Sequence, residues 1–132
     1  MIKDIIFPEV EDIAITIVRE YEGLDEYNAY IFNFREENIT NVLITSTGYG
    51  TINDEKKKTS TLRHYFEEIQ ALDYKLIEPV SKEVFGISNE YWVSFSMNGK
   101  MYDKQYVFLP ESIVESNFQT IPFIDKKGVI IK

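Results

Sequence analysis

The only histidine of the chain is the residue on which acid-base or metal chemistry would depend. His64 stands alone among 132 residues, and there is no cysteine. A nucleophilic triad needs a histidine base, which could only be His64. A zinc site needs several nitrogen or sulfur ligands, and His64 has no second histidine or cysteine to join it. At helical spacing, Glu67 and Glu68 would lie beside it. We therefore predict that His64 pairs with one of these glutamates on a helix surface. We identify no catalytic residue and expect no metal and no cofactor.

A run of lysines followed by hydroxyl residues is a candidate anion site. Its residues are Lys56, Lys57, Lys58, Thr59 and Ser60, placed just before a segment with helical spacing. Helix N-termini attract anions, and the lysines would add positive charge. The run lacks the glycine that precedes the lysine of a P-loop, and no strand-helix-strand unit surrounds it. A solvated, charged turn is the alternative.

Four carboxylates crowd one loop near the start of the chain. They are Glu20, Glu22, Asp25 and Glu26, and Tyr27, one of nine tyrosines, follows them directly. A calcium-binding EF-hand loop needs more length, a central glycine and flanking helices, so calcium is not expected. We predict that this acidic loop, together with the tyrosine excess, faces either a basic protein partner or solvent.

The central part of the sequence predicts a β-hairpin that turns at Asn98-Gly99. Both residues tolerate positive φ, which suits a two-residue type I′ turn. A loop of this length sets which residues of the two strands lie opposite each other. The expected pairs on one face are Met97 with Lys100, Phe95 with Tyr102, Val93 with Lys104, and Tyr91 with Tyr106. This face is aromatic, apart from its lysines, and should lie on the core.

The same register places Trp92, the only tryptophan, on the opposite and polar face of the hairpin. Its expected neighbours there are Ser94, Ser96, Asp103 and Gln105. A tryptophan in such surroundings can anchor a ligand or a protein partner. It can equally be covered by a loop or by a second layer of sheet, because tryptophan is highly buried on average. The sequence leaves both interpretations open.

The remaining elements are predicted from hydrophobic periodicity. Alternating patterns predict three strands over residues 12–19, 30–35 and 39–47, arranged as a meander. Apolar residues then follow helical spacing and predict an amphipathic helix over residues 60–72, through Leu62, Tyr65, Phe66, Ile69 and Leu72. The later predictions are a strand over 74–78, a helical turn over 81–86, a short helix over 110–117, and a closing hairpin over 123–131.

These elements together predict a single α+β domain covering residues 1–132. It would be a predominantly antiparallel sheet, built from a meander plus hairpins, with one principal helix packed on one face. The hydrophobic fraction of 44% is enough for one substantial core. No repeat or linker divides the chain.

The charge distribution bears on the partners. The net charge is −8, and residues 1–37 hold ten acidic and three basic residues, a local charge of −7. Such a field repels nucleic-acid phosphates and anionic lipids, so we expect neither nucleic acid nor membrane as a partner. The absence of cysteine, and an apolar run of only three residues near the start, indicate a cytoplasmic protein without a signal peptide.

The sequence favours a non-enzymatic protein-interaction domain of an adaptor, immunity or chaperone type, with an acidic, tyrosine-rich surface. Whether the chain is an enzyme stays open. The alternative is a small-molecule binder or enzyme with an aromatic pocket between sheet and helix, lined by Tyr30, Phe32, Tyr91, Phe95, Tyr102 and Tyr106. Association of identical chains through an edge strand or the terminal hairpin is compatible with either function.

Overall fold

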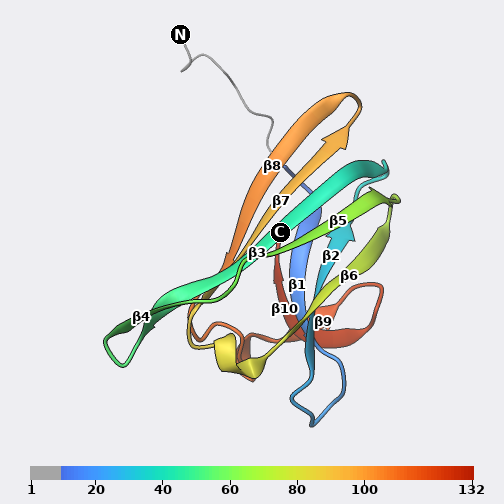
Figure 1. The fold of residues 1–132 in the computed structure, drawn as a ribbon. Helices are drawn as coiled ribbons and strands as arrows, with labels where there is room; N and C mark the ends of the chain where they lie inside the picture. Colours follow the sequence, from blue (N-terminus) through green and yellow to red (C-terminus); the bar gives the residue numbers. More distant parts are fainter. Residues whose placement is uncertain (1–9) are drawn as a thin grey trace.

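The computed structural model describes residues 10–132, which form two antiparallel sheets (Figure 1). The first sheet has the strand order β6-β2-β1-β10-β9. Its strands are β1 (Ile13–Arg19), β2 (Tyr27–Asn33), β6 (Asp73–Val80), β9 (Gln119–Ile121) and β10 (Lys126–Ile131). The second sheet has the order β4-β3-β7-β8, and β5 also pairs with β3. Its strands are β3 (Ile39–Ile52), β4 (Glu55–Lys58), β5 (Leu62–Ile69), β7 (Ser88–Met97) and β8 (Lys100–Phe108).

The main core lies between the two sheets. Strand β1 contributes Ile13, Ile15 and Ile17, and the second sheet contributes residues such as Val93 and Phe95. All five are almost completely buried, as expected for apolar side chains that alternate with outward residues along each strand. A smaller cluster of Ala14, Val18, Phe32 and Ile121 covers the other face of the first sheet.

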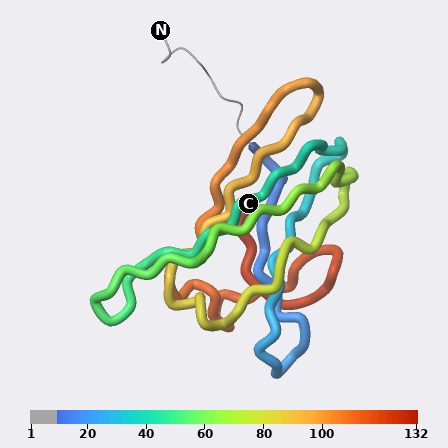
Figure 2. Tube along the Cα trace, in the orientation of Figure 1, coloured from blue at the N-terminus to red at the C-terminus, as the bar shows by residue number. Residues whose placement is uncertain are grey.

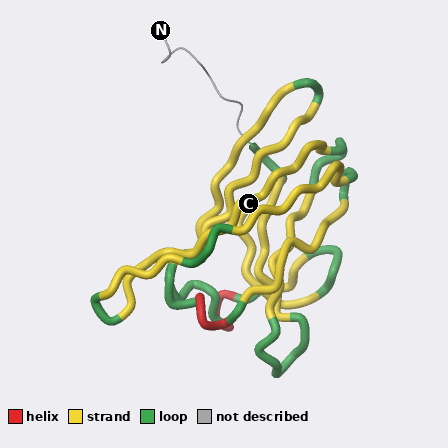
Figure 3. The backbone as a smooth tube through the Cα atoms, in the orientation of Figure 1, coloured by secondary structure: helices red, strands yellow, loops and turns green. Residues whose placement is uncertain are grey.

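The predicted principal helix does not exist, and the α+β assignment is wrong. Residues 62–69 form strand β5, which pairs with β3 through contacts such as Val42 opposite Phe66. Helical structure in the described residues is limited to the 3-10 turns η2 (Lys82–Val84) and η3 (Glu115–Asn117), drawn red in Figure 3. The apolar residues fit helical spacing, but the segment forms a strand because it pairs with β3 and because Ile69 is buried and Phe66 partly buried against the core. Only part of the expected apolar stripe is buried, because Leu62, Tyr65 and Leu72 are exposed.

The predicted opening meander is also wrong. Strands β1 and β2 pair as expected, but β3 belongs to the other sheet, and β2 pairs instead with β6. Strand β3 is longer than predicted, and its end forms a two-stranded arm with β4 that projects from the body (Figure 2).

The hairpin at Asn98-Gly99 is confirmed. Both residues have positive φ, 52° and 75°, and β7 pairs with β8 in the predicted register, with Phe95 opposite Tyr102 and Trp92 opposite Gln105. Lys104, the charge expected on the inner face, donates to the backbone oxygen of Val10 and lies 5.0 Å from the Tyr106 ring centre.

The C-terminal predictions are only partly confirmed. A closing hairpin is present, but its strands are β9 and β10, and Phe123 lies in the turn with φ of 71° and half of its surface exposed. The helix predicted over 110–117 reduces to η3. The turn predicted over 81–86 is present as η2, where Ser81 Oγ accepts a hydrogen bond from the Glu83 amide.

Candidate functional site

The acidic loop connects β1 to β2, and its members have different surroundings. Glu22 and Glu26 are exposed, and Asp25 pairs with Lys82 at 3.3 Å. Tyr27 is buried, with its ring 4.8 Å from that of Phe85 in an edge-to-face contact. Tyr27 is therefore a core residue, and the exposed aromatic side chain of this loop is Tyr21, which is 57% exposed.

Glu20 serves the structure of the first sheet. Its side chain is only 10% exposed, and it accepts hydrogen bonds from Lys126 Nζ at 2.6 Å, from Asn28 Nδ2 at 2.9 Å and from the Tyr30 hydroxyl. Burial opposes ionisation of Glu20, but the bonds from Lys126, Tyr30 and Asn28 outweigh it and lower the pKa of this carboxyl. Burial, together with the hydrogen bond to Glu20, raises the pKa of Tyr30.

The candidate anion site loses the helix on which it was based. Lys56, Lys57 and Lys58 lie in β4 on the projecting arm and are exposed, and Lys57 pairs with Glu55 at 3.1 Å. The hydroxyl of Thr59 is engaged locally, since it accepts from the Gly48 amide and donates to the Ser60 carbonyl. No helix N-terminus faces these side chains, because Ser60 leads into β5.

Trp92 lies on the outer face of the second sheet and is 45% exposed. In the neighbouring strands, Thr45 lies opposite both Trp92 and Arg63, and Leu43 lies opposite Tyr65. Leu43 and Tyr65 are exposed as well. We call this surface the Trp92 face and define it by Leu43, Thr45, Arg63, Tyr65, Trp92 and Gln105. The acidic loop belongs to the other sheet, so the two predicted surfaces are not combined into one.

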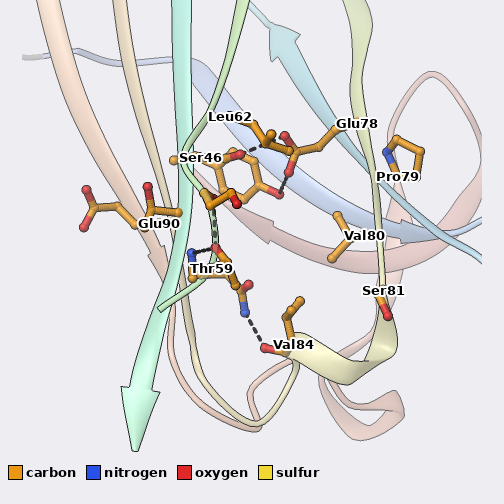
Figure 4. Close-up of a pocket in the computed structure, with 14 residues that line it drawn as sticks. Ser46, Thr59, Leu62, Glu78, Pro79, Val80, Ser81, Val84 and Glu90 are labelled. Atoms are coloured by element: carbon orange, nitrogen blue, oxygen red, sulfur yellow. Dashed lines mark hydrogen bonds between the residues drawn. The ribbon is translucent and has the colours of Figure 1, made fainter. Parts of the chain in front are cut away.

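A polar cluster between the sheets was not predicted. His64 in β5 does not pair with Glu67 or Glu68; its Nε2 lies 2.7 Å from Glu78 Oε1. Ser46 in β3 donates to the same oxygen at 2.8 Å, and the Tyr91 hydroxyl in β7 donates to Oε2 at 3.2 Å. Figure 4 shows the carboxylate of Glu78 directed from β6 toward Ser46 on the opposite sheet. Burial, reinforced by Glu78, raises the pKa of Tyr91.

A β-bulge in β6 directs Glu78 into the molecule. Ile31 lies opposite Lys75 and Ala29 lies opposite Glu78, so residues 29–31 of β2 correspond to residues 75–78 of β6, which has one residue more. Ile31 and Ala29 are both fully buried on the core side. The extra residue changes the phase of alternation, and bulges of this kind re-aim side chains. Glu78 consequently reaches the space between the sheets, and its side chain is 12% exposed.

A cavity of about 210 Å³ opens beside Glu78. Hydroxyl-bearing side chains make up much of its wall, and no lysine or arginine lines it. The lining includes Ser46, Thr47, Thr59, Ser60, Ser81 and Tyr91, with apolar contributions from Leu62, Val80 and Val84. The predicted aromatic pocket is not this cavity: of its six residues only Tyr91 lines it, while Phe32, Phe95 and Tyr106 are fully buried.

No family model and no curated protein matches this chain. Function therefore has to be argued from the chain's own chemistry. Within residues 10–132, no group of three histidine or carboxylate side chains is placed to hold a metal ion. The same residues contain no helix with the length and apolar character needed to cross a membrane.

No pattern in the sequence predicts the Glu78 cluster. Its four residues come from four strands, and no short motif links them. Glu78 itself falls at the end of a short predicted strand, where an unrecognised bulge decides the direction of its side chain.

Proposed function

We propose that this chain is a non-enzymatic protein-interaction domain of the adaptor, immunity or chaperone type, and that the Trp92 face holds the partner. The observation that supports this most is the exposure of Trp92, of which 45% stays open within the described residues. Large aromatic side chains in such positions are the commonest anchors of protein interfaces.

The two sheets differ in how far the chain covers their outer faces, and this difference supports the same conclusion. The chain covers the outer face of the first sheet with its own cluster around Phe32, packed by Tyr30, Phe34, Tyr74, Ile124 and Ile130. On the Trp92 face, Leu43, Tyr65 and Trp92 are 41%, 59% and 45% exposed. Grouped exposed apolar side chains of this size are typical of interaction surfaces.

The charge around this face favours a basic partner. Three exposed or half-buried carboxylates occur at outward positions of the same strands, namely Glu67, Glu90 and Asp103. Among the residues that define the Trp92 face, Arg63 is the basic one. The chain as a whole carries a charge of −8. Complementary charge accelerates association and selects against acidic competitors. The partner is therefore a protein that presents apolar side chains within a basic surface. The cysteine-free composition makes the cytoplasm the expected location.

The test compares partner capture by the wild type and by Trp92→Ala, with Leu24→Ala as the matched control. Leu24 is 54% exposed and lies in the acidic loop of the other sheet. We expect Trp92→Ala to weaken binding by about 30-fold, which corresponds to about 2 kcal/mol. Leu24→Ala should bind as the wild type does.

Fluorescence of the single tryptophan gives a direct readout with the purified partner. Emission should shift to shorter wavelength on binding, and the affinity should fall as salt is raised. A partner that binds Trp92→Ala as tightly as the wild type, or that leaves the emission unchanged, would rule out this face. Self-association of the wild type that Trp92→Ala abolishes would instead assign the face to a contact between identical chains and overturn the proposal.

A further inference from the structure

Glu78 is a nearly buried carboxylate whose hydrogen-bond partners leave one position open. A carboxylate has about four lone-pair positions on its two oxygens. Oε1 accepts from Ser46 and His64, and Oε2 accepts from Tyr91. One acceptor position of Oε2 is therefore unfilled by the described residues. Because Glu78 also lines the cavity, a ligand in that cavity can reach its carboxylate.

The hydroxyl groups beside Glu78 offer acceptors as well. Ser46 and Tyr91 each use their single O–H proton on Glu78, so their oxygens keep lone pairs and have no further proton to donate. The Thr59 hydroxyl proton is likewise used on the Ser60 carbonyl. The cavity thus presents the Glu78 carboxylate and several hydroxyl acceptors, and its lining also includes Glu90. A positively charged group that only donates hydrogen bonds complements the Glu78 end of this cavity.

The Glu20 site shows how this chain completes such a carboxylate elsewhere. There a tyrosine hydroxyl and an amide nitrogen donate to one oxygen, and the Lys126 ammonium donates to the other at 2.6 Å. At Glu78 the donors are two hydroxyl groups and the His64 imidazole, and no lysine or arginine within residues 10–132 bonds to the carboxylate. The acceptor position of Glu78 that would correspond to the one filled by Lys126 at Glu20 faces the cavity.

We propose that the cavity beside Glu78 binds a primary ammonium group, which donates to Glu78 Oε2 and to the hydroxyl oxygens around it. An ammonium has three donors and no acceptor, and it matches a wall without lysine or arginine. The volume of about 210 Å³ corresponds to roughly seven water molecules, so the site takes a small amine or the end of a lysine side chain. Binding of the ammonium involves no chemical step.

His64 is the alternative source of positive charge, since a protonated imidazole would neutralise Glu78 from within the chain. Glu78 is in contact with His64, Ser46 and Tyr91, and of these three groups His64 is the one that can carry a positive charge. His64→Gln keeps a donor toward Glu78 Oε1 and removes the option of a charge. It is therefore the variant that distinguishes an external ammonium from an internal imidazolium.

The experiment titrates the folded protein with n-butylammonium and follows backbone amide shifts by NMR. We expect saturable shifts at Ser46, Thr59 and Tyr91, and at least about tenfold weaker binding by Glu78→Gln, as for loss of a hydrogen bond to a charged group. Glu36→Gln, which removes the same charge from an exposed site, should bind as the wild type does. Tetramethylammonium carries the charge without N–H donors and should not shift these amides.

Two further arms identify the source of the ammonium and the role of His64. A peptide with one central lysine is compared with n-butylammonium: tighter binding by the peptide assigns the site to a lysine side chain, and equal or weaker binding assigns it to a free amine. His64→Gln should retain amine binding within about threefold. Absence of shifts in the wild type, equal binding by Glu78→Gln, or a requirement for His64 would each overturn the proposal. The amide spectrum of every variant also shows whether it is folded.

Discussion

Glu20 and Glu78 are two nearly buried carboxylates that the chain completes in different ways. Glu20, with 10% of its side chain exposed, is joined by the ammonium of Lys126 from β10. Glu78, with 12% exposed, is held by Ser46, His64 and Tyr91 and opens onto a cavity. Both have a tyrosine hydroxyl among their donors. Similar burial and hydrogen bonding therefore occur at a carboxylate that is closed by an ammonium of the chain and at one that keeps an acceptor position open to a cavity.

Removing the ammonium from the first site should have the largest effect. Lys126→Met leaves the Glu20 carboxylate with only the neutral donors Asn28 and Tyr30. We expect the free energy of unfolding at pH 7 to fall by about 1 to 2 kcal/mol, a figure reduced for the partial exposure of Lys126. Urea denaturation measures it. Lys127→Met is the matched control, since Lys127 bonds to Thr120 at the surface, and an equal loss in both variants would contradict the role of Glu20.

Acid should weaken the Glu20 site selectively. Its pKa is lowered in the folded state, so its contribution to stability is fully present above the unfolded pKa and is lost as pH falls through the folded pKa. The wild type should exceed Glu20→Gln in free energy of unfolding by about 1 kcal/mol at pH 7. That difference should shrink steadily as the pH falls below 4.5, the ordinary pKa of a glutamate carboxyl. Urea denaturation at several pH values checks this, and a difference that grows in acid would reverse the assignment.

Neutralising the second site should have a smaller effect than neutralising the first. In Glu78→Gln the amide oxygen still accepts from Ser46 and His64, and Tyr91 can rotate its hydroxyl to accept from the amide nitrogen. We expect the free energy of unfolding to change by less than about 1 kcal/mol. Urea denaturation beside Glu20→Gln makes the comparison. A loss larger than that of Glu20→Gln would mean that Glu78 is mainly structural.

The tyrosines of the two sites should ionise at a higher pH than an unfolded tyrosine, and this is the smallest of the expected effects. Burial and the neighbouring carboxylate raise the pKa of both Tyr30 and Tyr91, and burial raises that of Tyr106. These raised values favour the folded state below the unfolded tyrosine pKa, and this contribution is lost as pH rises through the folded values. At pH 11, phenolate absorbance of the folded protein should therefore stay below that of the unfolded chain. Tyr91→Phe should reduce the gap by one tyrosine, and a gap that Tyr91→Phe leaves unchanged would contradict the raised pKa of this side chain.

The sequence predicted best where local chemistry decides the structure. The Asn98-Gly99 turn requires positive φ at both residues, and its length sets the register, so the outward position of Trp92 followed directly. The helix over 60–72 failed because a few apolar residues fit both periodicities, and pairing with β3, some twenty residues earlier, is not encoded locally.

Local sequence accounts for the hairpin at Asn98-Gly99, the apolar inner face of β7, the acidic charge and the absence of cysteine chemistry. These follow from single residues and from neighbours along the chain. Long-range contacts, and no local pattern, place β3 in the second sheet, leave Trp92 exposed and bring Glu78 to Ser46, His64 and Tyr91. Those facts depend on strand pairing and on one bulge in β6, which bring together groups far apart in the sequence.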